Sequence, residues 1–366
     1  MAVNGARHDE HEGNRLAGAE LLAAFVALRE RHPRLRARDA AAELGVSEAE
    51  LLAARVGEEV VRLQADWADV VRALPALGPV MALTRNAHCV HEKHGRFDKV
   101  SIGPGHGLVL NEDIDLRLFM GHWRYGFAVT EEVASGRRKS LQFFDLDGSA
   151  VHKVYLTEES DLSAHNGLLE RFRAVDQSAP IEILSLPDWP HDRPDMEIAR
   201  SGLLDHWAAL QDTHDFHAML QEVGAGRLQA MRLAAGVFTR RLAPMAVRLL
   251  LEGAVRSQTP IMCFVGNPGC IQIHTGPIGT VKPTGPWLNV LDPTFNLHLR
   301  EDAVAHAYAV VKPTRDGDVT SLELFDRAGF CFCQFFGARK PGRPELEAWR
   351  NLVRSLPSDS LSESAS

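Results

Sequence analysis

The chain contains one pattern of residues twice. The segment 80–156 includes VMALTRNAHCVHEKHG, DIDLRLF and SLQFFDLDGSAVHKVYL, and the segment 261–336 includes the similar runs IMCFVGNPGCIQIHTG, NLHLRED and SLELFDRAGFCFCQFF. The pairs that lie 181 positions apart are Asn86 and Asn267, Gly95 and Gly276, Asp145 and Asp326, and Gly148 and Gly329. Arg117 and Arg300 lie 183 positions apart, which predicts a two-residue insertion in the second copy. A repeat at a nearly fixed offset indicates two similarly folded halves.

Each half is predicted to begin with helices and to end with strands. Apolar residues at helical spacing predict helices over 16–31, 39–44, 47–54, 58–74, 203–222 and 227–255, with Pro244 kinking the last. The later segments alternate apolar and polar residues, and Asp147-Gly148 and Asp316-Gly317 predict hairpin turns. The sequence therefore predicts an α+β fold of two tandem similar halves, each a helical segment followed by a large antiparallel β-sheet.

The boundaries follow from composition. We expect the first half to span 16–175 and the second half 197–350. The segment 176–196 between them contains four prolines, which predict an extended and semi-rigid linker. The terminal stretches 1–14 and 355–366 are polar and poor in large apolar residues, so we expect them to be disordered.

Composition excludes several classes of protein. Lys and Arg number 40 and Asp and Glu 48, giving a formal charge of −8, which does not favour sequence-independent nucleic-acid binding. Five scattered cysteines favour free thiols in a reducing compartment. The sequence shows neither an apolar signal region at its start nor an apolar stretch long enough for a membrane helix, so we expect a cytoplasmic protein without membrane insertion. It also lacks P-loop, dinucleotide-binding, HExxH and GxSxG motifs.

The run DTHDFH carries the first candidate site. Asp212 fits a helix N-cap and Asp215 fits the third position of a capping box. His214 and His217 would then share one face of the first helical turn, where an imidazole could bind haem iron. From these six residues alone, two surface histidines are the more common interpretation.

A second candidate lies late in the second half. Gln334 and Phe336 are two residues apart and so face the same side of a strand, and Lys312 and Arg339 lie on neighbouring segments. This combination suits a flat apolar ligand that carries carboxylates, because Arg pairs with carboxylate in a bidentate geometry. The alternative is an ordinary edge strand beside a solvated basic turn.

Two further clusters are weaker metal candidates. His88, His91 and His94 are three residues apart and would align on a helix to hold zinc, but the segment has strand character, which points neighbours in this series to opposite faces. Cys331 and Cys333 would share one face of a strand, and without a second pair nearby they are expected to be buried small hydrophobes.

The segment 34–52 resembles a helix-turn-helix. Gly45 would form the turn and Ser47 would cap the second helix. The first turn of that helix carries Glu48 and Glu50 rather than residues that read bases, so a helical hairpin packed in the core is favoured over DNA binding.

Taken as an ordered series, these motifs resemble the HemS-type hemin-degrading factor family, the cytoplasmic haem-trafficking proteins of bacterial haem-uptake systems. The resemblance covers about residues 20–350, both halves. The runs that carry it are TRNAHCVHEKHG (84–95), EDIDLRLF (112–119), SLQFFDLDGSAVHKVY (140–155), DTHDFHAML (212–220), GNPGCIQIHTGP (266–277), GPWLNVLDPTFNLHLRED (285–302), KPTRDG (312–317) and QFFGARKPG (334–342).

The resemblance implies a ligand and a site. Haem (iron protoporphyrin IX) would lie between the sheet and the helices of the second half. His214 would be the proximal iron ligand, His217 an alternate ligand, and Arg117 from the first half would lie on the distal side. The residues implied to line the pocket and hold the propionates are Lys312, Gln334, Phe336 and Arg339. Whether the first half binds a second haem is left open.

The resemblance leaves two functions open. One is a haem chaperone for iron acquisition, which receives haem at the cytoplasmic side of a haem ABC transporter and hands it to a haem oxygenase. The other is an enzyme that opens the porphyrin ring with a reductant and oxygen or peroxide, releasing iron, with Arg117 as its catalytic candidate. A helix-turn-helix regulator is a third and weaker alternative.

Overall fold

The computed structural model describes residues 16–33, 35–57, 59–133, 136–178, 180–185, 192–339 and 342–359. The predicted disorder of 1–14 and of 360–366 lies outside these residues, as does the part of the predicted linker at 186–191. Residues 355–359, which we expected in the tail, are described: Leu356 is 4% exposed and Ser358 pairs with Leu242. Within the described residues, no helix is long and apolar enough to cross a lipid bilayer.

The helices fall into two similar sets. Those of the first half are α1 Gly18–Arg31, α2 Ala37–Glu43, α3 Glu48–Ala53, α4 Trp67–Ala73 and α5 Leu162–Phe172. Those of the second half are α6 Arg200–Ala208, α7 Asp215–Val223, α8 Arg227–Leu233, α9 Ala246–Ser257 and α10 Glu347–Arg354.

The strands repeat in the same way. Those of the first half are β1 Val60–Arg62, β2 Val80–Arg85, β3 Cys89–Gly95, β4 Val100–Ile102, β5 His106–Leu110, β6 Asp115–Phe119, β7 Tyr125–Val133, β8 Gly136–Phe144 and β9 Ala150–Leu156. Those of the second half are β10 Thr239–Leu242, β11 Ile261–Asn267, β12 Cys270–Gly276, β13 Val281–Thr284, β14 Trp287–Leu291, β15 Phe295–Arg300, β16 His306–Lys312, β17 Val319–Phe325 and β18 Cys331–Gly337.

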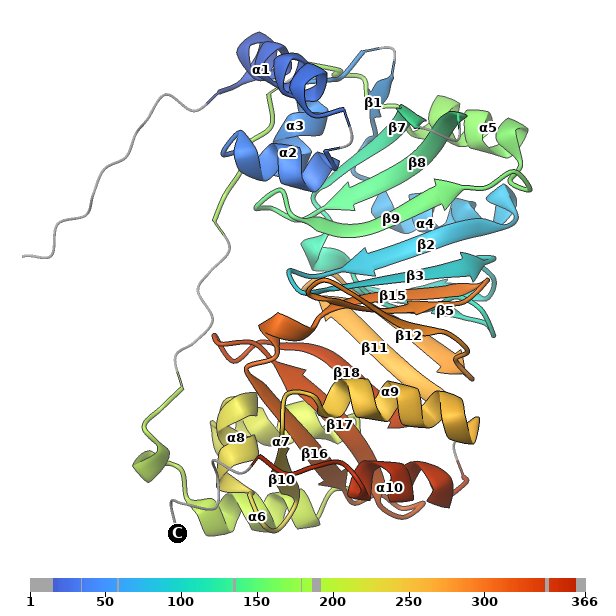
Figure 1. Cartoon of the computed structure of the whole chain (residues 1–366). Coiled ribbons are helices and arrows are strands. Elements are labelled where there is room, and N and C mark those ends of the chain that lie inside the picture. The colour runs from blue at the N-terminus through green and yellow to red at the C-terminus, as the bar shows by residue number, and fades with distance from the viewer. Residues whose placement is uncertain are drawn as a thin grey trace, which may run out of the picture.

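The strands build two nine-stranded antiparallel sheets, each shared between the halves. The first sheet has the order β1-β7-β8-β9-β2-β3-β15-β14-β13, and the second has β10-β16-β17-β18-β11-β12-β6-β5-β4. Each half therefore contributes six strands to one sheet and three strands to the other, and β15 lies beside β3 (Figure 1). The α+β class is confirmed, with one difference from the simple expectation: neither sheet belongs to a single half.

Two asparagines join the halves reciprocally. The Nδ2 of Asn86 donates to the carbonyls of Gly266 (3.0 Å) and Phe332 (2.8 Å). Its counterpart 181 positions on, Asn267, donates from Nδ2 to the carbonyls of Arg85 (2.9 Å) and Val151 (2.8 Å). Each Oδ1 also accepts two backbone N–H groups of its own turn, at 2.9–3.0 Å. The joint is thus symmetric, and each half fixes the β-turn of the other.

Two predicted helices are interrupted by strands. The segment 58–74 contains β1, which pairs with β7, and 227–255 contains β10, which pairs with β16. Both short strands are β-branched at their start, which favours pairing at the open edge of a sheet over continuing a helix. Pro244 lies between β10 and α9 and so kinks no helix. The hairpin turns at Asp147-Gly148 and Asp316-Gly317 are confirmed, with φ of 75° and 102° at the glycines.

Candidate functional site

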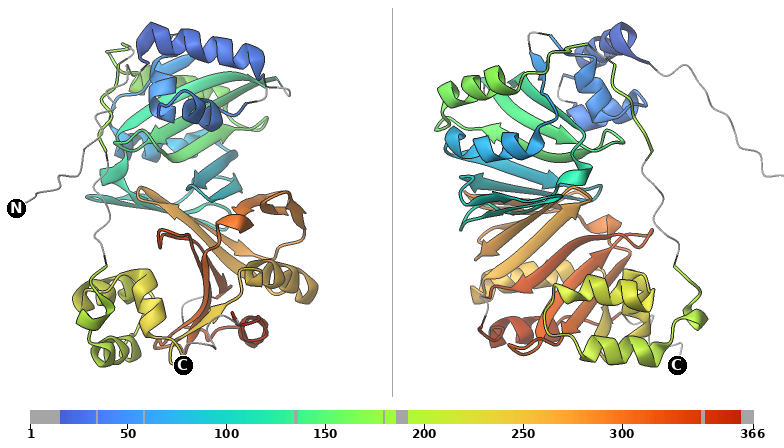
Figure 2. Two further views of the ribbon diagram at one scale, coloured as in Figure 1. Left: turned by 60° about the vertical axis from the view of Figure 1, so that its left-hand side comes forward. Right: turned by 180° about the vertical axis from the view of Figure 1, so that it is seen from behind.

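The second sheet has one covered and one partly open face. On one side, α9 and α10 pack with the three swapped strands of the first sheet against buried residues such as Phe335 and Leu322. On the other side, α6, α7 and α8 pack against Tyr308 and Val310 of β16 (Figure 2). These three helices cover β16 and reach Phe325 of β17 and Cys331 of β18, so the remainder of this face is less covered.

The open part of this face is a strip of half-buried, mostly apolar residues. Directly opposed residues of antiparallel strands share a face, and the pairing runs without a break from β17 to β6. Six of the half-buried members, which we call the ligand face, are Gln334 and Phe336 of β18, Met262 and Phe264 of β11, Ile271 of β12 and Arg117 of β6; Asp115 and Phe119 of β6 lie on the same side. The sequence analysis identified three of these six; the other three lie in ordinary strand runs.

Arg117 brings a residue of the first half to this face. Its strand β6 pairs with β12, placing Arg117 opposite Ile271. Its side chain is 30% exposed and forms an ion pair with Asp115 of the same strand. In the first sheet the matching pair is Val90 and His298. Val90 corresponds to Ile271, so the counterpart of Arg117 is His298, at the regular offset of 181. The predicted insertion and the pairing of Arg117 with Arg300 are therefore wrong: the shared Leu-Arg dipeptide was a chance match.

His214 lies at the start of α7, directly before the first helical residue. Asp212 does not cap the helix as predicted, and no capping box with Asp215 forms. Instead, Asp212 Oδ1 accepts the backbone N–H of His214 at 2.9 Å and its ring Nδ1–H at 2.6 Å. A carboxylate at Nδ1 fixes the tautomer in which Nε2 is free to bind a metal. The side chain is 83% exposed.

His217 and Arg339 flank this helix start. His217 is exposed in the first turn of α7. Arg339 follows β18 and lies near Asp212: hydrogen bonding from the His214 backbone lowers the pKa of the Asp212 carboxyl, and the positive charge of Arg339 lowers it further. The structure thus brings Arg339 of the second candidate site close to Asp212 of the DTH motif (212–214), although the two are far apart in sequence.

Lys312 is buried rather than available on the surface. Its Nζ donates to Glu323 Oε1 at 2.5 Å, and Arg227 of α8 donates from Nε to Glu323 Oε2 at 2.8 Å. Burial would raise the pKa of Glu323, but the charges of Arg227 and Lys312 lower it to about 2. The ammonium also lies 4.5 Å from the ring centre of Phe216 and 5.7 Å from that of Phe336. Sequence reasoning missed Glu323, because it alternates with leucines like a solvent-facing strand residue.

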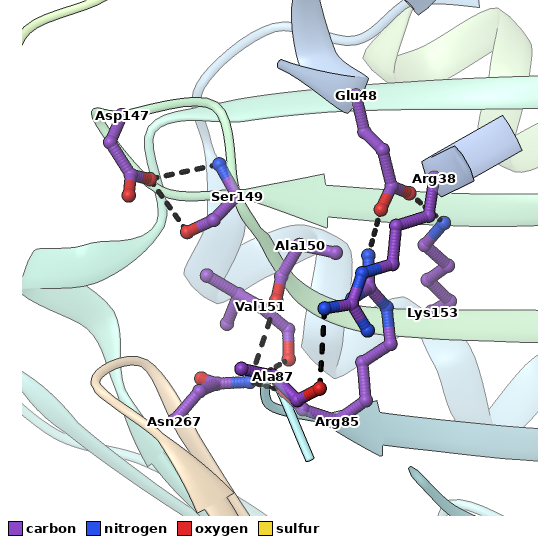
Figure 3. Close-up of polar contacts among 10 residues, drawn as sticks. All are labelled: Arg38, Glu48, Arg85, Ala87, Asp147, Ser149, Ala150, Val151, Lys153 and Asn267. Atoms are coloured by element: carbon purple, nitrogen blue, oxygen red, sulfur yellow. Dashed lines mark hydrogen bonds and ion pairs between the residues drawn. The ribbon is translucent and has the colours of Figure 1, made fainter. Parts of the chain in front are cut away.

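The corresponding face of the first sheet is closed by charges. Glu48, the first residue of α3, accepts from Lys153 Nζ at 2.7 Å and forms an ion pair with Arg85 (Figure 3). Arg38 of α2 donates to the carbonyl of Ala87 at 3.3 Å. Glu48 and Lys153 are 7% and 6% exposed, so α3 lies tightly on this face.

The helix-turn-helix shape is confirmed, but its second helix is engaged. Gly45 has φ of 67° and Ser47 caps α3 in a capping box with Glu50. Since the first turn of α3 holds Glu48 against the sheet, that turn faces the interior of the protein rather than a groove of DNA. The packed helical hairpin is the interpretation that this geometry supports.

His88, His91 and His94 do not meet at one site. His91 on β3 is fully buried, whereas His88 precedes the strand and its Nε2 lies 3.0 Å from the Asp326 carboxylate. Among the described residues, no group of three metal-ligating side chains is close enough to hold an ion.

Cys331 and Cys333 lie on opposite faces, contrary to the prediction. A bulge at Leu324 and Phe325 shifts the register of β17 against β18. Cys333 therefore contacts Cys263 in the core at 3.9 Å, while Cys331 accepts a weak hydrogen bond from Gln334 at 3.5 Å on the ligand face. A bulge inserts one residue and so reverses the expected alternation.

Comparison with known proteins identifies the fold. A family model described as the haemin-degrading HemS.ChuX domain matches residues 45–172 and again 224–356. The hemin transport protein HmuS of Yersinia pestis is 41% identical over 340 residues, 92% of this chain and 97% of that protein.

Solved structures agree over the same length. Holo-PhuS, a heme-binding protein from Pseudomonas aeruginosa, is 50% identical with a TM-score of 0.91, covering 93% of this chain and 99% of that one. The heme degrading enzyme ChuS of Escherichia coli O157:H7 is 36% identical with a TM-score of 0.86, covering 92% and 98%. Because one domain model matches both halves and the relatives align end to end, this chain belongs to the HemS/ChuX family.

Proposed function

We propose that the protein binds ferric haem on the ligand face through His214 and hands it on within the cytoplasm, as part of a bacterial haem-uptake and iron-acquisition system. One observation carries this proposal. The helix that begins after the exposed His214 lies close to the ligand face, since Lys312 Nζ is 4.5 Å from the Phe216 ring of α7 and 5.7 Å from the Phe336 ring, and Arg117 from the other half lies on the same face, opposite Ile271.

The dimensions of the strip suit a porphyrin. The four strands β18, β11, β12 and β6 are consecutive neighbours, so the strip is about 14 Å wide at the usual spacing between strands. Phe336 and Phe264 offer two aromatic rings, which meet edge-on at 5.1 Å, and Met262 offers one flexible apolar contact to a flat ligand. Micromolar affinity needs about 8 kcal/mol, which apolar burial together with one iron–imidazole bond can supply.

Charges at the edge of the strip suit the propionates. Arg339 beside the DTH motif is half-buried and has the planar donor geometry that matches a carboxylate. Lys312 is occupied by Glu323, so we expect it to attract the propionates through its charge, with Arg339 forming the direct contact.

Haem degradation is the second candidate, and Arg117 is the observation that favours it. If His214 binds the iron from one side, Arg117 lies on the other, distal side of the haem. There its positive charge could stabilise negative charge that develops during oxygen chemistry. ChuS, whose structure is described as that of a heme degrading enzyme, shares 36% of its residues with this chain.

Hemin titration tests the binding proposal. We expect one hemin per chain with a sharp Soret band, and an affinity loss of about 100-fold, or ~2.7 kcal/mol, in the double variant His214→Ala/His217→Ala. The single variant His214→Ala isolates the first ligand, because His217 can substitute for it. Protein that is colourless after equimolar hemin and desalting, or a double variant that binds like the wild type, contradicts the proposal.

Turnover separates the two candidates. The hemin complex is reduced by a physiological electron donor in the presence of catalase, with and without a haem oxygenase. Intact haem that moves to the oxygenase identifies a chaperone, whereas a regiospecific biliverdin-like product from the protein alone identifies an enzyme.

A further inference from the structure

The position of the His214 imidazole depends on the first turn of α7. The helix has no side-chain cap, and the hydrogen bonds of the His214 side chain within the described residues come only from the exposed Asp212. The first residue of α7 that is anchored in the core is Phe216, which is 2% exposed and meets the Trp207 ring edge-on at 4.7 Å. Whatever holds Phe216 therefore also holds His214.

Two cations, the buried Lys312 and the partly exposed Arg227, hold the Phe216 ring. Lys312 Nζ lies 4.5 Å and Arg227 Cζ 5.3 Å from its centre. Cations at these distances are attracted to an aromatic ring, and more strongly when they are removed from water. Lys312 comes from β16 and Arg227 from α8, so the contacts tie the start of α7 to both the sheet and the next helix.

Glu323 holds both cations in place. It is fully buried, accepts from Lys312 Nζ at 2.5 Å and from Arg227 at 2.8 Å, and also accepts from the Ser321 hydroxyl at 3.2 Å. Buried ion clusters contribute little net stability compared with apolar packing, which makes a positional role the better reason for this one. We call Lys312, Glu323, Arg227 and Phe216 the α7 clamp.

The clamp also reaches the floor of the ligand face. Lys312 Nζ lies 5.7 Å from the Phe336 ring, and Glu323 lies directly opposite Gln334 in the sheet. One ammonium therefore stands between a ring of the histidine-bearing helix and a ring of the ligand face. This geometry sets the separation between the imidazole and the face.

The first half, whose corresponding face is closed, lacks the clamp. The positions that match Lys312 and Glu323 at the offset of 181 are Glu131 and Gln142. In the helices before the sheet the offset is 179, since Val60 and Thr239 begin equivalent strands and Ser47 and Gly226 are equivalent N-caps, so the positions that match Arg227 and Phe216 are Glu48 and Ala37. At the same offset of 179, the position that matches His214 is Leu35. The clamp and the histidine that it would position thus occur together in one half and are both missing from the other.

We propose that the α7 clamp positions His214, and not His217, as the iron ligand over the ligand face, with Glu323 as its central positioning residue. This inference rests on the proposed haem binding. His217 lies inside α7, whose backbone hydrogen bonds hold it without the clamp, whereas His214 precedes the first helical residue; loosening the clamp therefore removes the preference for His214 rather than the capacity to bind.

The test measures the effect of Glu323→Gln when only one histidine is present. In the His217→Ala background, where His214 must act, we expect Glu323→Gln to weaken hemin binding about tenfold, the scale of lost support around a metal ligand. In the His214→Ala background we expect a change below about twofold, because the clamp does not act through His217. In the otherwise intact chain, the ferric Soret band should shift toward that of His214→Ala.

Two further variants test whether the effect comes from the change in charge alone or from the loss of any buried carboxylate. Phe216→Leu leaves every charge in place and should give the same selective loss. Glu48→Gln is the matched control, since it also removes a buried carboxylate held by two cations, but in the first half, and should not change the Soret band.

Equal losses in both histidine backgrounds, or unchanged binding and spectrum in Glu323→Gln and Phe216→Leu, overturn the clamp and leave haem binding intact. A wild-type chain that binds no hemin overturns both proposals.

Discussion

The two sheets present the same face in two different states. On the second sheet, Gln334 and Phe264 remain half-buried, and the ligand face is open. Their counterparts in the first sheet, Lys153 and Leu83, are 6% and 9% exposed beneath α3, which is held there by Glu48. Duplication has kept the backbone and not the site, so a repeated fold is no sign of a repeated function.

The joint between the halves shows the opposite behaviour. Asn86 and Asn267 make equivalent hydrogen bonds to equivalent carbonyls, and the counterparts Lys93 and His274 contact each other at 3.2 Å. Both turns must be held for the shared sheets to assemble, whereas binding one ligand requires only one open face. Equivalent residues are therefore kept in both halves at the joint, where they have the same structural role, but not at the ligand face.

The largest expected effect comes from breaking the charges that close the first face. Glu48→Ala leaves Lys153 and Arg85 buried without their shared anion, which should lower the free energy of unfolding by about 3–5 kcal/mol. Urea denaturation measures the loss. Glu132→Ala, which removes an exposed pair with Arg137, should cost less than about 0.5 kcal/mol.

A matched double variant checks the cause. Glu48→Ala combined with Lys153→Met should be more stable than Glu48→Ala alone, because one of the two uncompensated cations is gone. A loss below about 1 kcal/mol in Glu48→Ala would mean that the first face is closed by packing rather than by charge.

Much of the fold was predictable from the sequence because duplication and alternation are local signals. Repeated runs identified the halves, and Gly148 and Gly317 marked turns that need positive φ. The exchange of three strands between the sheets was not predictable, since β6 and β15 read alike whichever neighbour they pair with. The resemblance implied that Arg117 reaches the site of the second half, and the pairing of Arg117 with Ile271 shows how it does so.

The candidate site was predictable where a motif is compact. DTHDFH and the Gln334–Phe336 pair stand out by residue type and spacing. Glu323 and Arg227 did not, because a buried charge in a leucine-rich strand looks like a solvent-facing one, and its partner lies 96 residues away. Whether a charged residue joins a buried ion cluster depends on residues that are distant in the sequence, so no periodic pattern in the sequence predicts it.

The next effect tests the symmetric joint. Asn86→Ala and Asn267→Ala each leave two buried carbonyls and two turn N–H groups without their side-chain partner, so we expect each to cost about 2–3 kcal/mol. The two losses should agree within about 1 kcal/mol. A loss confined to one variant would show that only one half depends on the joint.

Acid should then separate the two halves. Burial lowers the pKa of His152 in β9 to about 3, whereas the matching position in β18 is Cys333, which gains no charge in acid. The unfolded chain protonates this histidine below about pH 6.5 and the folded chain does not. Stability is therefore complete above that pH and falls by about 1.4 kcal/mol per unit as pH drops toward the folded pKa.

Hydrogen exchange at pH 7 and pH 5 measures this difference strand by strand. Protection should fall more in β9 than in β18, and His152→Leu should flatten the dependence. His91 and His274, which burial also keeps neutral, lie where the sheets meet and should weaken both halves together. Equal loss in β9 and β18 would assign the acid sensitivity to that joint instead.

The smallest effect on stability is expected for a change at Arg117, the residue that the first half contributes to the ligand face. Arg117 is partly exposed and paired only with Asp115 among the described residues, so Arg117→Leu should change the unfolding free energy by less than about 1 kcal/mol. Its counterpart in the closed first face is His298, which its hydrogen bond to Asn289 at 2.7 Å holds in place. Since Arg117 has no comparable structural task, any change that Arg117→Leu makes to hemin chemistry reports on the ligand face itself.

We expect hemin affinity of Arg117→Leu to change less than about threefold, because the iron–imidazole bond and the apolar strip remain. The affinity of the ferric complex for added cyanide should fall further than hemin affinity does, because an anion on the distal side loses its cationic partner. Identical cyanide affinities in Arg117→Leu and the wild type would remove Arg117 from the distal side and leave the open face without a contribution from the first half.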